Sequence, residues 1–381
     1  MVAEERLMLE DFLKPTDINT SRFGGFGKAI TFYVNNLPDL EDIDIALIGI
    51  KDGRESQDNE NCSQAPDMVR EQLMKLEAAY PKMRVADLGN ITPGETFRDT
   101  AAALYMVMEE LLGQHVIPII IGGGYDLLFA QYRAFERFAK DAEVVTFDSR
   151  IELADDSTLH NIIMHEPNYL FNLTCAGYQT YFVNQKALDV MERMFFDIHR
   201  LGYLRNNMEE AEPILRNAHL GAFNISAIKQ ADAPGNYHSS PNGFTAHEAC
   251  QIARYAGLSN KLRSFGLYEL NPEFDNNHQT AKLAAQMLWY FIDGYYNRKN
   301  DDPADHAEDN YTKYRTALSN HKHEIVFYKS KKSDRWWMQV PHPKTKENTI
   351  PIMVPCSYND YQTALNDEMP DRWWRAHQKL I

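Results

Sequence analysis

Two short apolar runs, each followed at once by polar residues, constrain the fold of this chain most strongly. The first run, residues 116–121, reads Val-Ile-Pro-Ile-Ile-Ile, and the second, residues 144–147, reads Val-Val-Thr-Phe. Neither run contains a charge, and both are rich in β-branched residues. Such runs are typical of strands that are buried on both faces, as in a parallel sheet covered by helices.

The residues after these two runs indicate where a functional site would lie. Three glycines, 122–124, follow the first run and lead into a predicted helix over residues 127–140. The second run ends on alternating polar side chains, Asp148, Arg150 and Glu152. Open α/β sheets place their sites just beyond the carboxyl ends of parallel strands. We therefore expect the candidate site at this edge of the sheet.

The rest of the chain up to about residue 297 alternates between strand-like and helix-like segments. Apolar residues recur at helical spacing in 96–115, and Thr245 is an expected N-cap with Glu248 at capping-box spacing. Further strands are predicted at 43–50, 83–91, 173–183, 218–226 and 263–272, and further helices at 65–76, 186–201, from 246 and at 280–296. This alternation predicts a three-layer α/β/α fold with a mainly parallel sheet.

Three regions are predicted: an N-terminal arm (1–42), the α/β domain (43–299) and a C-terminal extension (300–381). The extension begins with a charge-rich linker, 301–309, and continues with three alternating segments, 323–328, 335–340 and 349–354. These segments predict a small antiparallel meander, which a final helix follows after Ser357. Two Arg-Trp-Trp triplets, 335–337 and 372–374, belong either to a core of this extension or to an interface.

Composition excludes several classes of function. The 381 residues carry a formal net charge of −15, which argues against non-specific binding to nucleic acid or to an anionic membrane surface. The four cysteines are scattered without a CxxC pair, so neither a disulfide scaffold nor a zinc site is expected. No signal peptide and no long apolar run is visible, so we expect a cytoplasmic protein without a membrane segment.

Several motifs resemble those of the arginase, agmatinase and formimidoylglutamase family, the ureohydrolases. That family carries Gly-Gly-Asp-His-Ser, Asp-Ala-His-x-Asp and Ser-Phe-Asp-x-Asp after successive strands, where this chain has 122–126, 148–152 and 222–226. The helix start at 65–70, the strand at 83–91 and the Glu269-to-Pro272 segment also resemble the family. The resemblance spans roughly 43–297, and it implies an arginase-like fold.

The same resemblance implies that the metal-binding positions have changed. In the family, six His and Asp side chains of the three motifs hold two manganese ions. The matching positions here are Tyr125, Asp148, Arg150, Glu152, Asn224 and Ser226. Only Asp148 is unchanged, and Glu152 keeps a carboxylate on a longer side chain. We therefore predict no metal cofactor, with Asp126 and Glu269 as further pocket residues.

Arg150 decides this prediction, because a guanidinium stays protonated and cannot ligate a metal ion. Its planar fork is suited to bidentate pairing with a carboxylate. We therefore expect Arg150 to neutralise at least one of the carboxylates left by the metals, Asp148, Glu152 or Glu269. In the alternative, Arg150 caps a strand end at the surface.

Three classes of function remain open. The first is a non-catalytic member of the fold that binds or scaffolds an unknown protein partner or small ligand. The second is a hydrolase of C–N bonds in a guanidino or formimino compound, with a remodelled site that would use manganese. The third is a metal-free enzyme of other chemistry that uses Tyr125, Asp126, Asp148 and Glu269. The resemblance also implies self-association as a homo-oligomer.

Overall fold

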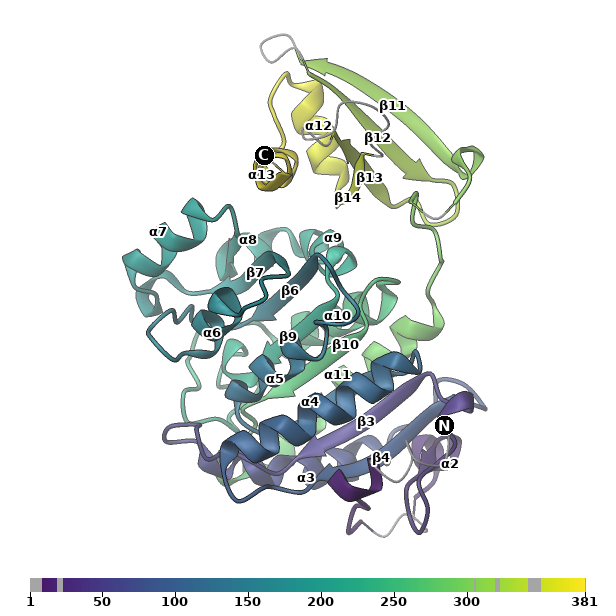
Figure 1. The fold of residues 1–381 in the computed structure, drawn as a ribbon, viewed down its shortest axis with the longest axis vertical. Coiled ribbons are helices and arrows are strands. Elements are labelled where there is room, and N and C mark those ends of the chain that lie inside the picture. The colour runs from purple at the N-terminus through teal and green to yellow at the C-terminus, as the bar shows by residue number, and fades with distance from the viewer. Residues whose placement is uncertain (1–8, 19–22, 305, 319–322, 342–350, 381) are drawn as a thin grey trace.

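The computed structural model describes residues 9–18, 23–304, 306–318, 323–341 and 351–380. Within them, ten strands form one mainly parallel sheet (Figure 1). In chain order these strands are β1 (Leu13–Lys14), β2 (Thr31–Phe32), β3 (Ile45–Ile50), β4 (Val85–Ile91), β5 (Ile117–Ile121), β6 (Ala142–Phe147), β7 (Leu170–Tyr178), β8 (Asp197–Arg200), β9 (Leu220–Asn224) and β10 (Ser264–Tyr268). Their order across the sheet is β1-β4-β3-β5-β10-β9-β6-β7-β8, with β2 also paired to β4. Only the β1–β4 pair is antiparallel in this sheet.

Helices cover both faces of the sheet, and they are α2 (Gly25–Ala29), α3 (Ala65–Leu73), α4 (Phe97–Gly113), α5 (Leu128–Arg133), α6 (Thr158–Met164), α7 (Gln185–Arg193), α8 (Leu201–Asn206), α9 (Ala211–Asn217), α10 (Ala246–Leu258) and α11 (Gln279–Tyr296). Helices α3, α10 and α11 pack on one face, and α4 to α7 pack on the other. Alternation along β3 divides its side chains between these layers: Ile45 and Leu47 face α3, while Ala46 and Ile48 face α4. The predicted three-layer α/β/α fold is confirmed.

Local sequence signals account for several helix ends. Helix α4 begins with a capping box between Thr96 and Asp99, and α10 begins with the predicted box between Thr245 and Glu248. Two predicted helices are shorter than expected. The helix expected at 127–140 forms only α5, and the one expected at 186–201 ends at Arg193, where the chain turns into edge strand β8.

The C-terminal extension forms a separate unit, which we call the C-terminal module. Strands β11 (Tyr311–Leu318), β12 (His323–Ser330), β13 (Trp336–Val340) and β14 (Ile352–Cys356) form an antiparallel sheet in this order. Helices α12 (Tyr358–Leu365) and α13 (Asp371–Leu380) follow it, and Ser357 caps α12 together with Asp360. The predicted β-rich extension is confirmed, with β11 as a strand that was not expected. Part of the predicted segment 349–354 lies outside the described residues.

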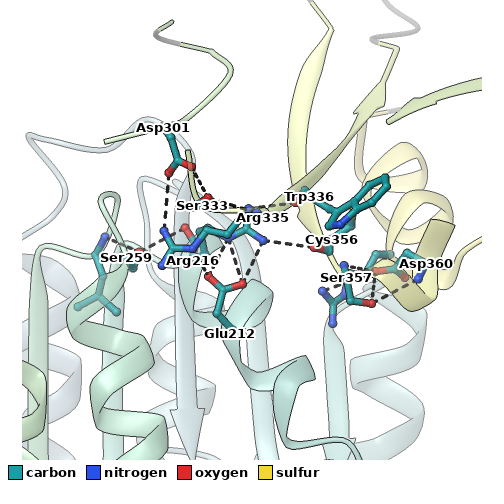
Figure 2. A network of polar contacts seen from close by, with 12 residues as sticks. Glu212, Arg216, Ser259, Asp301, Ser333, Arg335, Trp336, Cys356, Ser357 and Asp360 are labelled. Carbon is teal, nitrogen blue, oxygen red and sulfur yellow. Dashed lines mark hydrogen bonds and ion pairs between the residues drawn. The ribbon is translucent and has the colours of Figure 1, made fainter. Parts of the chain in front are cut away.

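Arg216 of α9 contacts the C-terminal module from the α/β domain (Figure 2). The guanidinium of Arg216 donates to the backbone oxygens of Trp336, at 3.0 Å, and Cys356, at 3.2 Å. It also lies 4.2 Å from the ring centre of Trp337, and it pairs with Glu212 at 3.0 Å. One buried arginine therefore joins the last turn of α9 to two strands of the module.

Further ion pairs extend this contact, which we call the seam. Arg335 of the module pairs with Glu212 at 3.0 Å and lies 3.8 Å from Asp301 (Figure 2). Arg372 of α13 pairs with Glu210 at 2.6 Å. Burial in the seam makes these pairs sensitive to the loss of either partner.

The two Arg-Trp-Trp triplets thus serve both of the roles left open by the sequence. Trp336 and Trp373 belong to the apolar core of the module. The triplet arginines, Arg335 and Arg372, reach the α/β domain, and Trp337 contacts Arg216 there. No helix in the described part of the chain is both long and apolar enough to cross a membrane.

Candidate functional site

All eight residues predicted from the sequence line one pocket of about 300 Å³. This candidate pocket lies at the carboxyl edge of four neighbouring strands, β5, β10, β9 and β6. The residues are Tyr125 and Asp126 after β5, Asp148, Arg150 and Glu152 after β6, Asn224 and Ser226 at the end of β9, and Glu269 after β10. Because parallel strands end at the same edge, segments far apart in the sequence meet there.

The glycines after β5 allow a turn that other residues would not. Gly122 and Gly123 both have φ near +77°, a conformation that glycine adopts readily. A Cβ on Gly123 would lie 2.6 Å from the Leu127 Cδ1 atom, so the turn is also sterically closed to larger residues. The carbonyl of Gly123 accepts a hydrogen bond from the Glu269 amide at 3.0 Å. This contact ties the end of β5 to the end of β10.

Asp148 is held by neutral hydrogen-bond donors. The Asn224 amide donates to Oδ2 at 2.8 Å, and the Ser226 hydroxyl donates to Oδ1 at 3.3 Å. The backbone N–H of Arg150 also donates to Oδ1, at 3.0 Å. Burial raises the pKa of Asp148 to about 6, and these donors offset only part of that effect. Asn224 and Ser226, which stand at two of the family's metal positions, therefore donate hydrogen bonds to Asp148, the one family ligand that is unchanged.

The Arg150 side chain corrects the expectation that it neutralises a pocket carboxylate. Its guanidinium lies over the ring of Phe182, 4.6 Å from the ring centre. Among the described residues, Asp148 accepts from the backbone N–H of Arg150 and not from its guanidinium. A cation is attracted to the face of an aromatic ring, and counting the charged residues of the sequence does not reveal such a contact.

Glu269 is fixed by three hydrogen bonds to its carboxylate. Oε1 accepts from the Ser56 hydroxyl at 2.7 Å and from the Tyr125 backbone N–H at 2.7 Å, and Oε2 accepts from the Asn59 amide at 2.6 Å. Its backbone has a φ of +68°, which is unusual for a glutamate. The strained backbone and the three donors together orient the carboxylate at the pocket wall.

The remaining predicted residues differ in their protonation and exposure. Burial raises the pKa of Asp126 to about 6, although the Thr158 hydroxyl donates to it at 3.1 Å. Burial and the nearby Asp148 carboxylate raise the pKa of Tyr125 well above its usual value, so its phenol stays neutral. Glu152 lies exposed at the rim of the pocket. The pocket thus contains two carboxyl groups that change charge near pH 6.

Sequence reasoning did not single out the residues that orient these groups. Ser56 and Asn59 come from the polar segment between β3 and α3. Thr158 begins α6, and His238 lines the pocket from the loop after β9. These residues are polar and lie in segments next to the predicted strand ends. Most surface loops are equally polar, so this signal does not mark a site.

The side chains at the six family positions do not fit a pair of manganese ions. Manganese prefers carboxylate, carbonyl and imidazole ligands, but only Asp148 and Glu152 supply carboxylates here. Arg150 carries a fixed positive charge, and the Asn224 amide nitrogen faces Asp148 as a donor. No group of three or more His, Cys, Asp and Glu side chains in the described residues is arranged to hold a metal ion.

Comparison with known proteins decides the family. A sequence profile of the arginase family matches residues 43–293, about two thirds of the chain. The chain belongs to the arginase family. It is 23% identical over 278 residues to formimidoylglutamase of Staphylococcus haemolyticus, covering 68% of this chain and 89% of that protein. It is 24% identical over 243 residues to formimidoylglutamase of Staphylococcus aureus strain JH9, covering 60% and 78%.

Solved structures of the arginase family share the fold. The crystal structure of Trypanosoma cruzi formiminoglutamase with manganese has a TM-score of 0.62 at 19% identity, covering 68% of this chain and 96% of that one. Formimidoylglutamase from Bacillus subtilis has a TM-score of 0.64 at 18% identity, covering 74% and 95%. At this level of identity the likeness shows the fold alone.

Proposed function

We propose that this arginase-family protein lacks the binuclear manganese centre and acts as a non-catalytic binding or scaffolding protein. The arrangement around Asp148 carries the proposal. Asn224 and Ser226 donate hydrogen bonds to its two carboxylate oxygens, where the family resemblance implies metal ligands. A buried carboxylate needs either a cation or donors, and here donors satisfy it. Self-association and a cytoplasmic location remain predictions of the same proposal.

An open pocket supports a ligand-binding role within this proposal. About 300 Å³ remains between the pocket walls, and the Arg150 guanidinium lies over the ring of Phe182. Tyr125 packs edge-on to Tyr268, with 6.0 Å between the ring centres. A volume of this size accommodates a small molecule.

Hydrolysis of C–N bonds in a guanidino or formimino compound is the second candidate. Asp126 and Asp148 both have pKa values raised to about 6, which suits proton transfer near neutral pH. The similarity to proteins named formimidoylglutamase favours the formimino class. The two candidates differ in metal content and in turnover.

Metal content, measured together with turnover, tests the proposal. The protein is expressed with added manganese and desalted, and its metal is then counted by elemental analysis. It is also assayed with guanidino and formimino substrates. We expect far less than one manganese per chain and no turnover above buffer. Stoichiometric manganese with turnover would instead establish the hydrolase.

A restored variant serves as the matched control. It carries five substitutions, Tyr125→His, Arg150→His, Glu152→Asp, Asn224→Asp and Ser226→Asp, which rebuild the family's motifs. We expect this variant to retain manganese after desalting, since it supplies hard oxygen and imidazole ligands. Retention by the variant but not by the natural chain would show that the assay detects a binuclear site when one is present.

A further inference from the structure

A second and larger cavity lies between the C-terminal module and the α/β domain. It has a volume of about 510 Å³, compared with about 300 Å³ for the candidate pocket. Its floor is the amino edge of β6, β7, β8 and β9, the opposite edge from the candidate pocket. Strand β14 and helix α13 of the module close its other side. We call it the seam cavity.

The seam cavity has both apolar and charged residues in its walls. Phe171, Ile214, Val354 and Leu380 contribute apolar surface from both the domain and the module. Polar groups lie on the floor, where the strands begin. A molecule that fits it would have a short apolar body and a polar end.

The carboxylates of this floor are already satisfied by the protein. Glu143 accepts from Lys261 at 3.0 Å and from the Asn217 amide. Asp197 accepts from the Asn172 amide at 2.7 Å, and Lys379 lies 3.7 Å from it. These anions therefore have no need of a cationic ligand.

The same floor also carries N–H donors that a ligand could use. The Glu143 backbone N–H donates to Nδ1 of His219 at 3.1 Å, so the neutral ring carries its proton on Nε2. Burial and the nearby cations lower the pKa of His219 to about 3, which keeps the ring neutral. No described residue accepts from this Nε2–H group.

Lysine side chains add to these donors. Lys379 is nearly buried; its ammonium donates to the Asn172 side chain at 2.6 Å and lies 3.7 Å from Asp197, which leaves one of its three N–H groups for a ligand. Lys379 and Lys261 both act on the Glu143 carboxylate, and Lys261 also acts on His219. The donors thus gather around one point of the cavity floor.

We propose that the seam cavity binds a small organic anion, a carboxylate on a short aliphatic chain. The carboxylate accepts from Lys379, Lys261 and the His219 Nε2–H group. The aliphatic chain lies against Phe171, Ile214 and Val354. Because the donors come from both the domain and α13, the ligand joins the two parts of the protein at a site distinct from the candidate pocket.

Binding of hexanoate to the full-length protein tests this inference. Hexylamine has the same chain with the opposite charge and serves as the matched probe. Titration calorimetry with the natural chain should detect hexanoate in the millimolar range or tighter, and hexylamine at least about tenfold weaker. Equal binding of the two probes, or none of hexanoate, would overturn the proposal.

Two lysine variants locate the anion. Lys379→Met keeps most of the apolar stem and should weaken hexanoate binding by about tenfold or more, because it removes a charge-assisted donor. Lys282→Met changes a lysine of α11 whose ammonium donates to the Asn277 carbonyl, and it should leave binding unchanged. Equal effects of the two substitutions would show that hexanoate does not bind at the seam.

Hydrogen exchange on the natural chain gives a readout that does not depend on how a variant folds. Hexanoate should slow exchange in α13 and around 197–199. Protection confined to residues 148–158 would place the anion in the candidate pocket, and the proposal would then be wrong.

Discussion

The two edges of the central sheet stabilise buried acidic groups in different ways. At the carboxyl edge, neutral amide, hydroxyl and backbone donors surround Asp148. Beyond the amino edge, arginines pair with the acidic groups of the seam, as Arg216 and Arg335 do with Glu212. Both arrangements satisfy the carboxylates, but only the second brings a compensating charge.

This difference separates a region where charge can change from one where it is fixed. Neutral donors leave the burial of Asp148 partly uncompensated, and its pKa rises to about 6. Arginine stays charged at every physiological pH, so the positive partner of each seam pair is fixed. The candidate pocket therefore holds carboxyl groups whose charge changes near pH 6, whereas the arginines of the seam keep their charge.

The largest expected effect is on the seam. Arg216→Met should destabilise the protein by about 3–5 kcal/mol, because Glu212 is left without one of its charged partners and two backbone oxygens lose their donor. Chemical denaturation measures the free energy of unfolding. Limited proteolysis should also cut the linker before β11 more readily in the variant.

An exposed pair on the module provides the control for Arg216. Arg315 pairs with Glu324 at 3.2 Å, with both side chains more than half exposed. Arg315→Met should therefore change the free energy of unfolding by less than about 1 kcal/mol. If the two arginine variants lost equal stability, the contrast between buried and exposed pairs would be refuted.

A smaller effect is expected from Asp148, and it depends on pH. The folded-state pKa of Asp148, about 6, lies above its ordinary value of 3.8, so the folded state holds the proton more tightly. The stability from this group is complete below about pH 4 and is lost as pH rises through 6. Between pH 4 and pH 7 the natural chain should lose about 2 kcal/mol relative to Asp148→Asn.

Denaturation at these two pH values measures that difference. Asp155→Asn, at an exposed position, is the control and should follow the natural chain at both pH values. If the natural chain instead gained stability relative to Asp148→Asn between pH 4 and pH 7, the folded protein would stabilise the Asp148 carboxylate as an anion.

The smallest effect is expected from Arg150. Arg150→Met removes only a cation–ring contact with Phe182, so it should cost about 0.5–1 kcal/mol. The pH dependence due to Asp148 should stay the same, which denaturation at pH 4 and pH 7 would show. A marked rise of the Asp148 pKa in this variant would show that Arg150 does neutralise the Asp148 carboxylate.

The sequence predicted the strands that carry the candidate pocket because their signals are local. The run 116–121 and its glycines mark a buried strand and a turn within a few residues of each other. Strand β8 escaped prediction, since its four residues, Asp-Ile-His-Arg, carry no strand pattern of their own. Tertiary pairing with β7 decides its conformation.

Contacts between distant parts of the chain account for the rest of what was missed. Ser56 and Glu269 are 213 residues apart, and Arg216 and Trp336 are 120 apart. The sequence gives the charge of Arg150 but not its direction, which the ring of Phe182 decides. Residue type was therefore enough to place the pocket but not to predict how its charges are satisfied.

Strand β13 carries a consequence for where this arginase-family protein can be shortened. Neighbouring residues of a strand point to opposite faces, so Trp336 faces the interior of the module while Trp337 covers Arg216. A chain ending at residue 299 would keep the family-matched sequence. It would leave Arg216 and its partner Glu212 without their contacts to the module. We therefore expect a chain cut at residue 299 to be less stable than the full chain, although the family profile matches only residues 43–293.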